Sequence, residues 1–546
     1  MMELHSRIAA HGVLAIALLC ALLSTLFSGS ALAQSAAAPS WVAPPPRFVD
    51  AERRAKLAAA FPAIDQRIRD FLLREQVPGA AWGVVIDGEL AHVGLYGVRD
   101  VASGAPVQRD SVFRIASMTK SFTALATLQL RDSGRLTLDD PVEKYVPELR
   151  ALRYPTTDSP RITIRQLLTH AEGFPEDNPW GDQQLAISEE RFDELLRSGI
   201  PFSNSPGVAY EYSNYGFAIL GRVITRASGV PYREYIARHI LEPLNMRSTT
   251  LEPRSVPPAQ LALGYRREDD RWKLEPQLAD GAFGAMGGML TSLEDLARYV
   301  GVFLDAWPPR DGVERAPLSR ASLREMQQLW RARPSVVSRG ANGVTQLNVG
   351  GYGYGLRVSE SCDFGHVVAH SGGLPGFGSQ MRWLPEYGVG LIAFGNRTYT
   401  GWTGVFDGAL LDLQASGGLV PREIQPSPAL DEARRGVNAL LQRWDDAQAT
   451  HLAAMNLFLD RSLERRRDEF AKLRETQGSC RERPGYLYNE NSLRGDWVLD
   501  CERGIIQASV TLAPTVPPAI QHLELRALAA GVDITEATGL PPRRCR

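Results

Sequence analysis

Strand-forming segments lie at both ends of residues 50–400, and this arrangement restricts the fold more than any other feature of the sequence. Residues 82–86 and 90–96 are apolar, and Asp87-Gly88 between them predicts a β-hairpin. The second group of strand-like segments is 352–358, 366–370, 379–384 and 389–394. The residues between the two groups are mostly helical in pattern. We therefore expect an α+β fold (an α/β sandwich), in which one antiparallel sheet is flanked by helices and a helical subdomain lies alongside.

The first 33 residues have the pattern of an export signal. Arg7 supplies positive charge, residues 13–27 are apolar, and Ala31-Leu32-Ala33 is a small-x-small cleavage site. The apolar run is shorter than the ~20 residues that a membrane span needs, which argues against a permanent anchor. We expect cleavage after Ala33 and a periplasmic or secreted mature chain without a stable membrane span. Residues 34–49, rich in alanine and proline, are expected to form a linker.

Two regions that differ in composition and in hydrophobic pattern follow the linker. Residues 50–420 contain all the motifs described below and are expected to form the main domain. Residues 425–546 change from a charged, helix-like stretch to a strand-rich one, which predicts a small α+β accessory module with a faint resemblance to the cone-shaped nuclear-transport-factor fold. Signal cleavage would leave Cys362, Cys480, Cys501 and Cys545, and these allow three disulfide pairings or four free thiols. Cys480 with Cys501 is the preferred pair because both lie in this module.

Charge and lysine content narrow the possible chemistry. The formal net charge is -2 and no basic block occurs, so nothing favours a nucleic-acid partner. Lysine is scarce, because almost all basic residues are arginine. A lysine at a meaningful spacing is therefore informative.

Ser117 and Lys120 form such a pair at the start of an expected helix. Residues three apart share one helix face, so the two side chains would lie side by side. A serine hydroxyl is a poor nucleophile until a base removes its proton, and a buried lysine can be that base because burial lowers its pKa. Ser-x-x-Lys alone is a common coincidence, but this is the only example in the chain.

Two further motifs follow in the chain. Tyr212-Ser213-Asn214 lies in a loop before an apolar helix, where a tyrosine beside a lysine could titrate low enough to relay protons. His370-Ser371-Gly372-Gly373 ends an expected strand, and its glycines would let a substrate approach the backbone. The backbone N–H groups of Gly373 and Ser117 could form an oxyanion hole. Each motif taken alone could equally be structural.

Together the three motifs resemble those of the penicillin-recognising serine hydrolases, which include class C β-lactamases, D-aminopeptidases, D-alanyl-D-alanine carboxypeptidases and related esterases. The resemblance covers about residues 50–400 and implies a β-lactamase-like fold. It implies that Ser117 is acylated, that Lys120 and Tyr212 share the proton transfers, and that Asn214, His370, Gly372 and Gly373 bind the substrate. It implies no cofactor and no metal. Glu172 departs from the usual Thr-Ser-Gly of this family, and its role does not follow from the sequence.

The third motif differs from the β-lactamase pattern, which has lysine where this chain has His370. A histidine is a weaker and pH-dependent anchor for a substrate carboxylate. We therefore expect hydrolysis of a small peptide, a D-amino-acid amide or an ester, as in D-aminopeptidases, D,D-peptidases or esterases. A class C-like β-lactamase and a catalytically silent binding protein are the alternatives. An α/β-hydrolase with Ser371 as nucleophile is disfavoured, because a strand rather than a helix follows Ser371.

Overall fold

The computed structural model describes residues 38–314, 317–339, 343 and 345–541. The expected signal segment and Cys545 lie outside these residues. In the described part of the chain, none of the helices combines the length and the apolar character that crossing a membrane requires.

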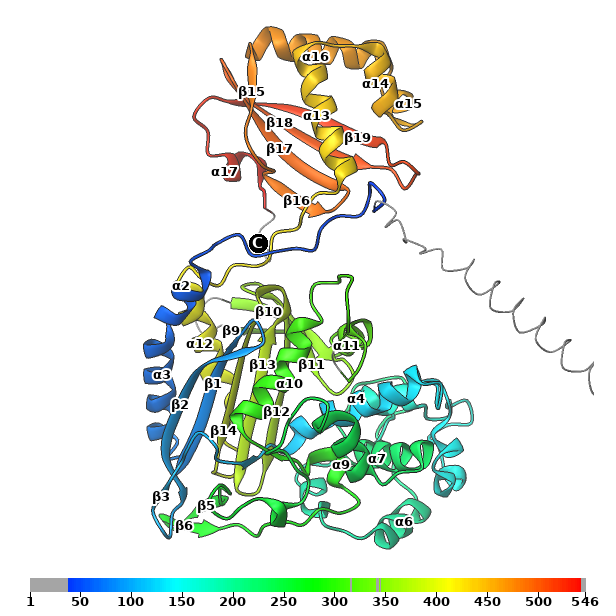
Figure 1. Cartoon of the computed structure of the whole chain (residues 1–546). Helices are drawn as coiled ribbons and strands as arrows, with labels where there is room; N and C mark the ends of the chain where they lie inside the picture. The colour runs from blue at the N-terminus through cyan, green and yellow to red at the C-terminus, as the bar shows by residue number, and fades with distance from the viewer. Residues whose placement is uncertain (1–37, 315–316, 340–342, 344, 542–546) are drawn as a thin grey trace, which may run out of the picture.

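One large antiparallel sheet forms the centre of the main domain and confirms the expectation that both ends of this segment build it (Figure 1). Strand β1 from the first group pairs directly with β14 from the second, from Ile86 opposite Val389 to Ala80 opposite Gly395. The order is β3-β2-β1-β14-β13-β12-β11-β10-β8, and β9 pairs with β10. The strands are β1 (Gly79–Ile86), β2 (Glu89–Asp100), β3 (Ala105–Pro106), β8 (Arg331–Ala332), β9 (Val336–Arg339), β10 (Thr345–Tyr352), β11 (Arg357–Ser361), β12 (Gly365–Leu374), β13 (Phe377–Leu384) and β14 (Val389–Gly395).

One expected strand is wrong. Residues 352–358 do not form a single strand, because β10 ends at Tyr352 and β11 begins at Arg357. Gly355 in the turn between them has a φ of 66°, which glycine adopts at little cost. A Cβ at Gly355 would lie 2.6 Å from the backbone oxygen of Lys120, so the turn is packed tightly on the helix that carries Lys120.

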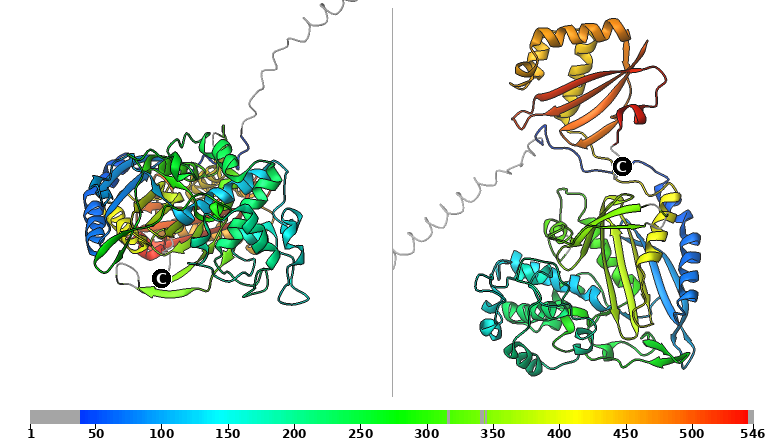
Figure 2. Two further views of the ribbon diagram at one scale, coloured as in Figure 1. Left: turned by 90° about the horizontal axis from the view of Figure 1, so that it is seen from below. Right: turned by 180° about the vertical axis from the view of Figure 1, so that it is seen from behind.

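Helices cover both faces of the sheet (Figures 1 and 2). On one face lie α3 (Phe61–Arg74), preceded by α2 (Arg53–Ala59), and α12 (Thr403–Ala415). Trp82 of β1 is buried there, and its Nε1 donates to Asp65 Oδ1 of α3 at 2.8 Å. On the other face α10 (Leu293–Asp305) packs against β1, β2, β13 and β14, and Ser292 caps it by accepting from the Asp295 N–H.

The helical subdomain packs against this second face and shares its hydrophobic core. Its central helices α4 (Thr119–Asp132), α7 (Asn214–Ser228) and α9 (Gly284–Gly287) contact one another. The remaining helices are α5 (Ile164–Leu168), α6 (Glu189–Ser198), α8 (Tyr232–Ile236) and α11 (Arg320–Met326). Two small ribbons, β4 (Phe113–Arg114) with β7 (Leu290–Thr291) and β5 (Tyr265–Glu268) with β6 (Arg271–Leu274), complete the domain.

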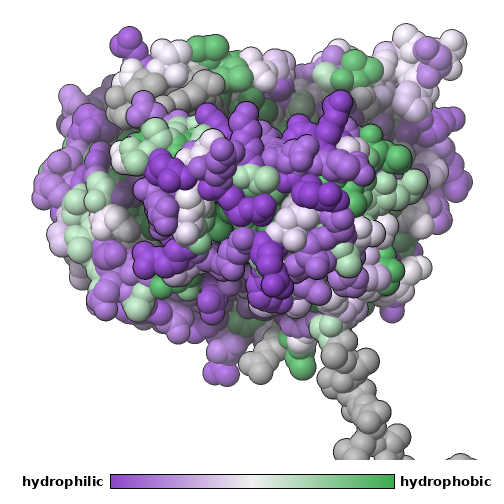
Figure 3. All heavy atoms as spheres, turned by 90° about the horizontal axis from the view of Figure 1, so that it is seen from above, coloured by the Kyte–Doolittle hydropathy of each residue, from purple (hydrophilic) through white to green (hydrophobic). Residues whose placement is uncertain are grey.

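A separate sheet forms the C-terminal module. It is built from β15 (Cys480–Glu482), β16 (Tyr488–Asn491), β17 (Arg494–Cys501), β18 (Gly504–Leu512) and β19 (Ile520–Ala529). The helices of the module are α13 (Pro428–Gln442), α14 (Asp446–Leu452), α15 (Leu457–Asp460), α16 (Leu463–Gln477) and α17 (Ile534–Thr538). The preferred disulfide, Cys480–Cys501, is present and joins β15 to β17. The end of the molecule that carries this module is mostly hydrophilic (Figure 3).

We expect Gly94→Ala to destabilise the main domain by about 1–3 kcal/mol, the usual range for overpacking a buried site. Gly94 of β2 lies opposite Trp82, and a Cβ there would be 1.9 Å from the Trp82 ring, which Asp65 holds in place. Gly404→Ala in α12 is the matched control, because a Cβ at Gly404 meets nothing within 4 Å. It should be neutral or slightly stabilising. Urea unfolding followed by tryptophan fluorescence measures both, and equal stability of the two variants would contradict this packing.

Candidate active site

Ser117 lies where a short 3-10 turn, η1 (Ala116–Met118), leads into α4. Ala116 has a φ of 50°, in the left-handed region that residues other than glycine rarely adopt. This sharp turn places Ser117 at the N-terminal end of α4, where the helix dipole stabilises developing negative charge. The Ser117 side chain is almost buried but remains part of a cavity wall.

Lys120 is completely buried one turn further along α4. Its Nζ lies 3.1 Å from Ser117 Oγ, and it donates to Asn214 Oδ1 at 2.7 Å and to the Met286 backbone oxygen at 2.8 Å. Burial lowers the pKa of Lys120 to about 7. An uncharged lysine has two N–H groups and one lone pair. Asn214 and Met286 can take the two N–H groups, which leaves the lone pair directed at the Ser117 hydroxyl.

Tyr212 completes the group around the serine. It lines the same cavity as Ser117, and its ring centroid lies 4.9 Å from Lys120 Nζ. The expectation that Tyr212 titrates low is wrong, because burial raises its pKa above the ordinary value. Tyr212 is therefore a neutral hydroxyl, suited to passing a proton on, whereas Lys120 is suited to accepting the first one.

Asn214 begins helix α7, and the chain fixes it through several side chains. Ser213 caps the helix by accepting from the Gly216 N–H. The carboxylate of Asp177 accepts from the Asn214 N–H at 2.7 Å. The Asn214 side-chain amide donates to Asn178 Oδ1 at 2.6 Å, which leaves its oxygen for Lys120.

His170 supports the same loop from behind, a contribution that the motif search missed. Its φ of 55° marks a sharp turn, its Nδ1 accepts from the Ser213 N–H at 3.1 Å, and its ring centroid lies 4.3 Å from that of Tyr212. Glu172 is buried close by, and a Cβ at Gly216 would lie 2.2 Å from its Oε1. Burial raises the pKa of Glu172 well above its usual range, so this side chain is a neutral packing group.

His370 is buried among protein groups and does not line the cavity next to Ser117. Its Nδ1 donates to the Ser371 backbone oxygen at 2.7 Å, so its Nε2 accepts from the Tyr352 hydroxyl at 2.7 Å. Burial lowers its pKa well below the ordinary value. We expected His370 to be a substrate anchor that titrates near neutrality. The part of this expectation that concerns its pKa is therefore wrong.

The two glycines of this motif have different surroundings. A Cβ at Gly372 would lie 2.1 Å from the Ile115 backbone oxygen, so Gly372 allows β12 to pack closely against the turn that carries Ser117. Gly373 lines the cavity together with Ser117, as an oxyanion-hole residue must.

The cavity next to Ser117 has a volume of about 470 Å³. Besides Ser117, Tyr212 and Gly373, its wall contains Ser371 of the third motif and six residues that belong to none of the three motifs. The six are Glu176, Asn178, Pro179, Asp182, Arg357 and Tyr399. The polar and charged members of these six come from loops and strand ends without a recognisable spacing, so the sequence offered no signal for them.

Arg357 is the cation of this wall. It begins β11, and its guanidinium carbon lies 5.7 Å from the Tyr212 ring centroid. Its Nε is buried without a hydrogen-bond partner, and no carboxylate of the described residues forms an ion pair with it. A partly buried guanidinium without a counter-ion is well placed to bind an anionic group of a ligand.

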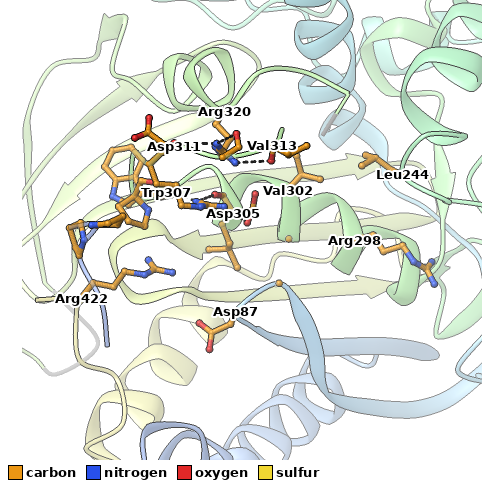
Figure 4. A pocket seen from close by; sticks show the side chains of 18 residues that line it. Asp87, Leu244, Arg298, Val302, Asp305, Trp307, Asp311, Val313, Arg320 and Arg422 are labelled. Atoms are coloured by element: carbon orange, nitrogen blue, oxygen red, sulfur yellow. Dashed lines mark hydrogen bonds and ion pairs between the residues drawn. The ribbon is translucent and has the colours of Figure 1, made fainter. Parts of the chain in front are cut away.

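A second hollow, of about 900 Å³, lies away from these residues beside the β1–β2 turn and α10 (Figure 4). Two of its arginines already have partners: Arg310 pairs with Asp305, and Arg320 donates to the backbone oxygens of Arg310 and Gly312. The described residues that line it include no nucleophile with a neighbouring base. No three His, Cys, Asp or Glu side chains of the described residues are grouped as a metal site.

The sequence is similar to those of several known proteins. The chain is 28% identical over 339 residues to Protein flp of Staphylococcus aureus (strain MW2), a match that covers 61% of this chain and 62% of that protein. It is 26% identical over 325 residues to Penicillin-binding protein 4* of Bacillus subtilis (strain 168), covering 57% of this chain and 66% of that protein. The chain therefore matches somewhat under two thirds of the length of these relatives.

The fold is also similar to a solved structure. The octameric penicillin-binding protein homologue from Pyrococcus abyssi superimposes with a TM-score of 0.55 at 22% identity, over 86% of this chain and 91% of that chain. The profile of the family described as Beta-lactamase matches residues 64–416, which include Ser117, Lys120, Tyr212 and the His370 motif. This chain belongs to the beta-lactamase family.

Proposed function

We propose that this chain hydrolyses an amide or ester bond through an acyl-enzyme on Ser117. The observation that carries the proposal is the Lys120 Nζ within 3.1 Å of Ser117 Oγ, buried and with a pKa lowered to about 7. A group with that pKa is half unprotonated near neutrality, which suits a general base.

The reaction follows from these positions. Lys120 takes the proton of Ser117 while Oγ bonds to the substrate carbonyl carbon, and the carbonyl electrons move to oxygen. The backbone N–H groups of Ser117 and Gly373 stabilise that oxyanion. Lys120 returns the proton through Tyr212 to the leaving amine or alcohol as its bond to carbon breaks. Water then attacks the acyl-enzyme with the same groups acting in reverse, which releases the acid and restores Ser117.

The substrates we propose are short peptides, D-amino-acid amides or esters, as in D-aminopeptidases and D,D-peptidases. The burial of His370 supports this choice over a class C-like β-lactamase, because no third-motif lysine projects into the cavity. Arg357 supplies a cation in the cavity, so a carboxylate on the leaving group could still bind. A catalytically silent binding protein is the alternative. Such a protein has no evident use for a buried lysine whose Nζ contacts a serine hydroxyl. The expected periplasmic or secreted location fits such substrates and stays a prediction.

Ser117→Ala should abolish both hydrolysis and labelling by a fluorophosphonate probe while leaving the fold intact, because it removes only the reacting oxygen. Peptide mass mapping of the wild-type adduct should place the probe on Ser117. An adduct on Ser371 would overturn the assignment of the nucleophile. No labelling of the folded wild-type protein would favour the silent binding protein.

Lys120→Ala and Tyr212→Phe should each lower kcat at least ~100-fold, the usual scale for losing acid–base help. In the double variant, the increases in activation free energy from the two substitutions should not add, because the two residues act on one proton. In the wild type kcat/KM should fall as the pH drops below about 7, since the protonated form of Lys120 cannot accept the Ser117 proton. Lys144→Ala, which alters an exposed lysine paired with Asp140, should keep the wild-type profile. A rate that is independent of pH between 5 and 8 would exclude Lys120 as the base.

Arg357→Ala should raise KM at least ~10-fold for a peptide with a free C-terminal carboxylate and leave KM for the matching C-terminal amide within about 3-fold. Arg333→Ala is the control, because Arg333 is exposed and does not line the cavity. Equal changes for the two substrates would show that Arg357 acts on the fold and not on a carboxylate.

A further inference from the structure

A buried carboxylate forms another part of the wall around Ser117. Asp182 lies in the 3-10 turn η4 (Gly181–Gln184), is 2% exposed, and lines the same cavity as Ser117 and Tyr212. Its Oδ2 accepts from the Tyr399 hydroxyl at 2.9 Å. Tyr399 is itself fixed against β12, since a Cβ at Gly373 would lie 2.7 Å from its ring. A hydrogen bond therefore holds the carboxylate in the wall of the cavity that contains Ser117.

Asp182 has a charge without a full partner. In the part of the chain that the structure describes, it forms no ion pair, and Arg357 on the same cavity wall is also unpaired. Burial raises the pKa of Asp182, and the hydrogen bond from Tyr399 and the charge of Lys120 oppose that rise. However, Lys120 must lose its charge to act as a base, and a carboxylate buried with a single neutral donor is costly. During catalysis Asp182 would then have no ion-pair partner among the described residues.

We propose that Asp182, held by Tyr399, binds the ammonium group of the substrate, on the residue that supplies the acyl carbon. This inference rests on the proposed hydrolysis at Ser117. An α-ammonium is only two bonds from the carbonyl carbon that Ser117 attacks, and Asp182 lines the same cavity as Ser117. The substrate class is then a peptide, amide or ester with a free amino group next to the scissile bond.

The arrangement would also couple binding to chemistry. Without substrate, the Asp182 carboxylate stabilises the protonated form of Lys120. A bound ammonium would offset that carboxylate and so favour the uncharged Lys120 that removes the Ser117 proton. A substrate whose amino group is blocked loses both the ion pair and this assistance.

The test compares ligands that differ only at the amino group. 1-Aminoethylboronic acid and its N-acetyl derivative both bond through boron to a reactive serine, and their concentrations for half-protection of Ser117 against a fluorophosphonate probe can be measured. On the wild type we expect the free amine to protect at a concentration at least ~10-fold lower. Equal protection, or better protection by the acetylated form, overturns the inference while the labelling of Ser117 upholds the hydrolase. A folded protein whose Ser117 is not labelled overturns both.

Two variants then locate the effect. Asp182→Asn should reduce the preference for the free amine to less than about 3-fold, with protection by the acetylated form nearly unchanged. Glu176→Gln is the matched control, because Glu176 lines the same cavity but is exposed to solvent, which screens its charge. It should keep most of the preference. If the preference for the free amine were lost in Glu176→Gln and kept in Asp182→Asn, the ammonium would bind to Glu176 and not to Asp182. That result would overturn the proposal. The wild-type comparison stands even if Asp182→Asn does not fold.

Discussion

The burial of one lysine is the constraint on which the active site depends. Lys120 is completely buried, and its Nζ is held by groups from three helices: Ser117 before α4, Asn214 at the start of α7, and the Met286 backbone oxygen in α9. A buried amine needs such partners, because an unsatisfied one would be very unfavourable. The three helices therefore have to meet at one point, and each of the three contacts the other two. The position of Asp177, His170 and the other loop residues follows from holding Asn214 there.

The polar groups of the site fall into an uncharged set and a charged set. Tyr212, His370 and Glu172 are buried, and desolvation keeps each of them uncharged near neutrality. Arg357 and Asp182 line the same cavity as Tyr212, and no ion pair of the described residues balances their charges. In the proposed mechanism, uncharged groups thus carry out the proton transfer, whereas charged groups of the same cavity recognise a charged ligand. This separation lets the substrate class change through wall residues without altering the base.

The sequence predicts those parts of the structure that depend on local or periodic patterns. The Asp87-Gly88 hairpin, the helix that follows Ser117 and the α+β sheet built from both ends are confirmed, because turn residues and apolar spacing determine them directly. Arg357, Asp182 and Tyr399 could not be predicted. Each is a common residue in a loop or at a strand end, and only the tertiary fold brings it to the cavity. The environment of His370 was missed for the same reason, since its partner Tyr352 comes from a different strand.

The pairing of β1 with β14 also sets the order in which the molecule can form. Ile86 and Val389 are neighbours in the sheet although more than 300 residues separate them in the chain. Closing so long a loop has a large entropic cost, which must be met before the contacts between the strands stabilise the fold. Contacts between residues far apart in the chain therefore make folding slow. During synthesis, the β1–β2 hairpin must wait with an apolar edge uncovered until nearly the whole main domain has been made. Unpaired strand edges of this kind promote aggregation. We therefore expect chaperones that shield extended apolar segments to determine how much of this protein reaches its folded state.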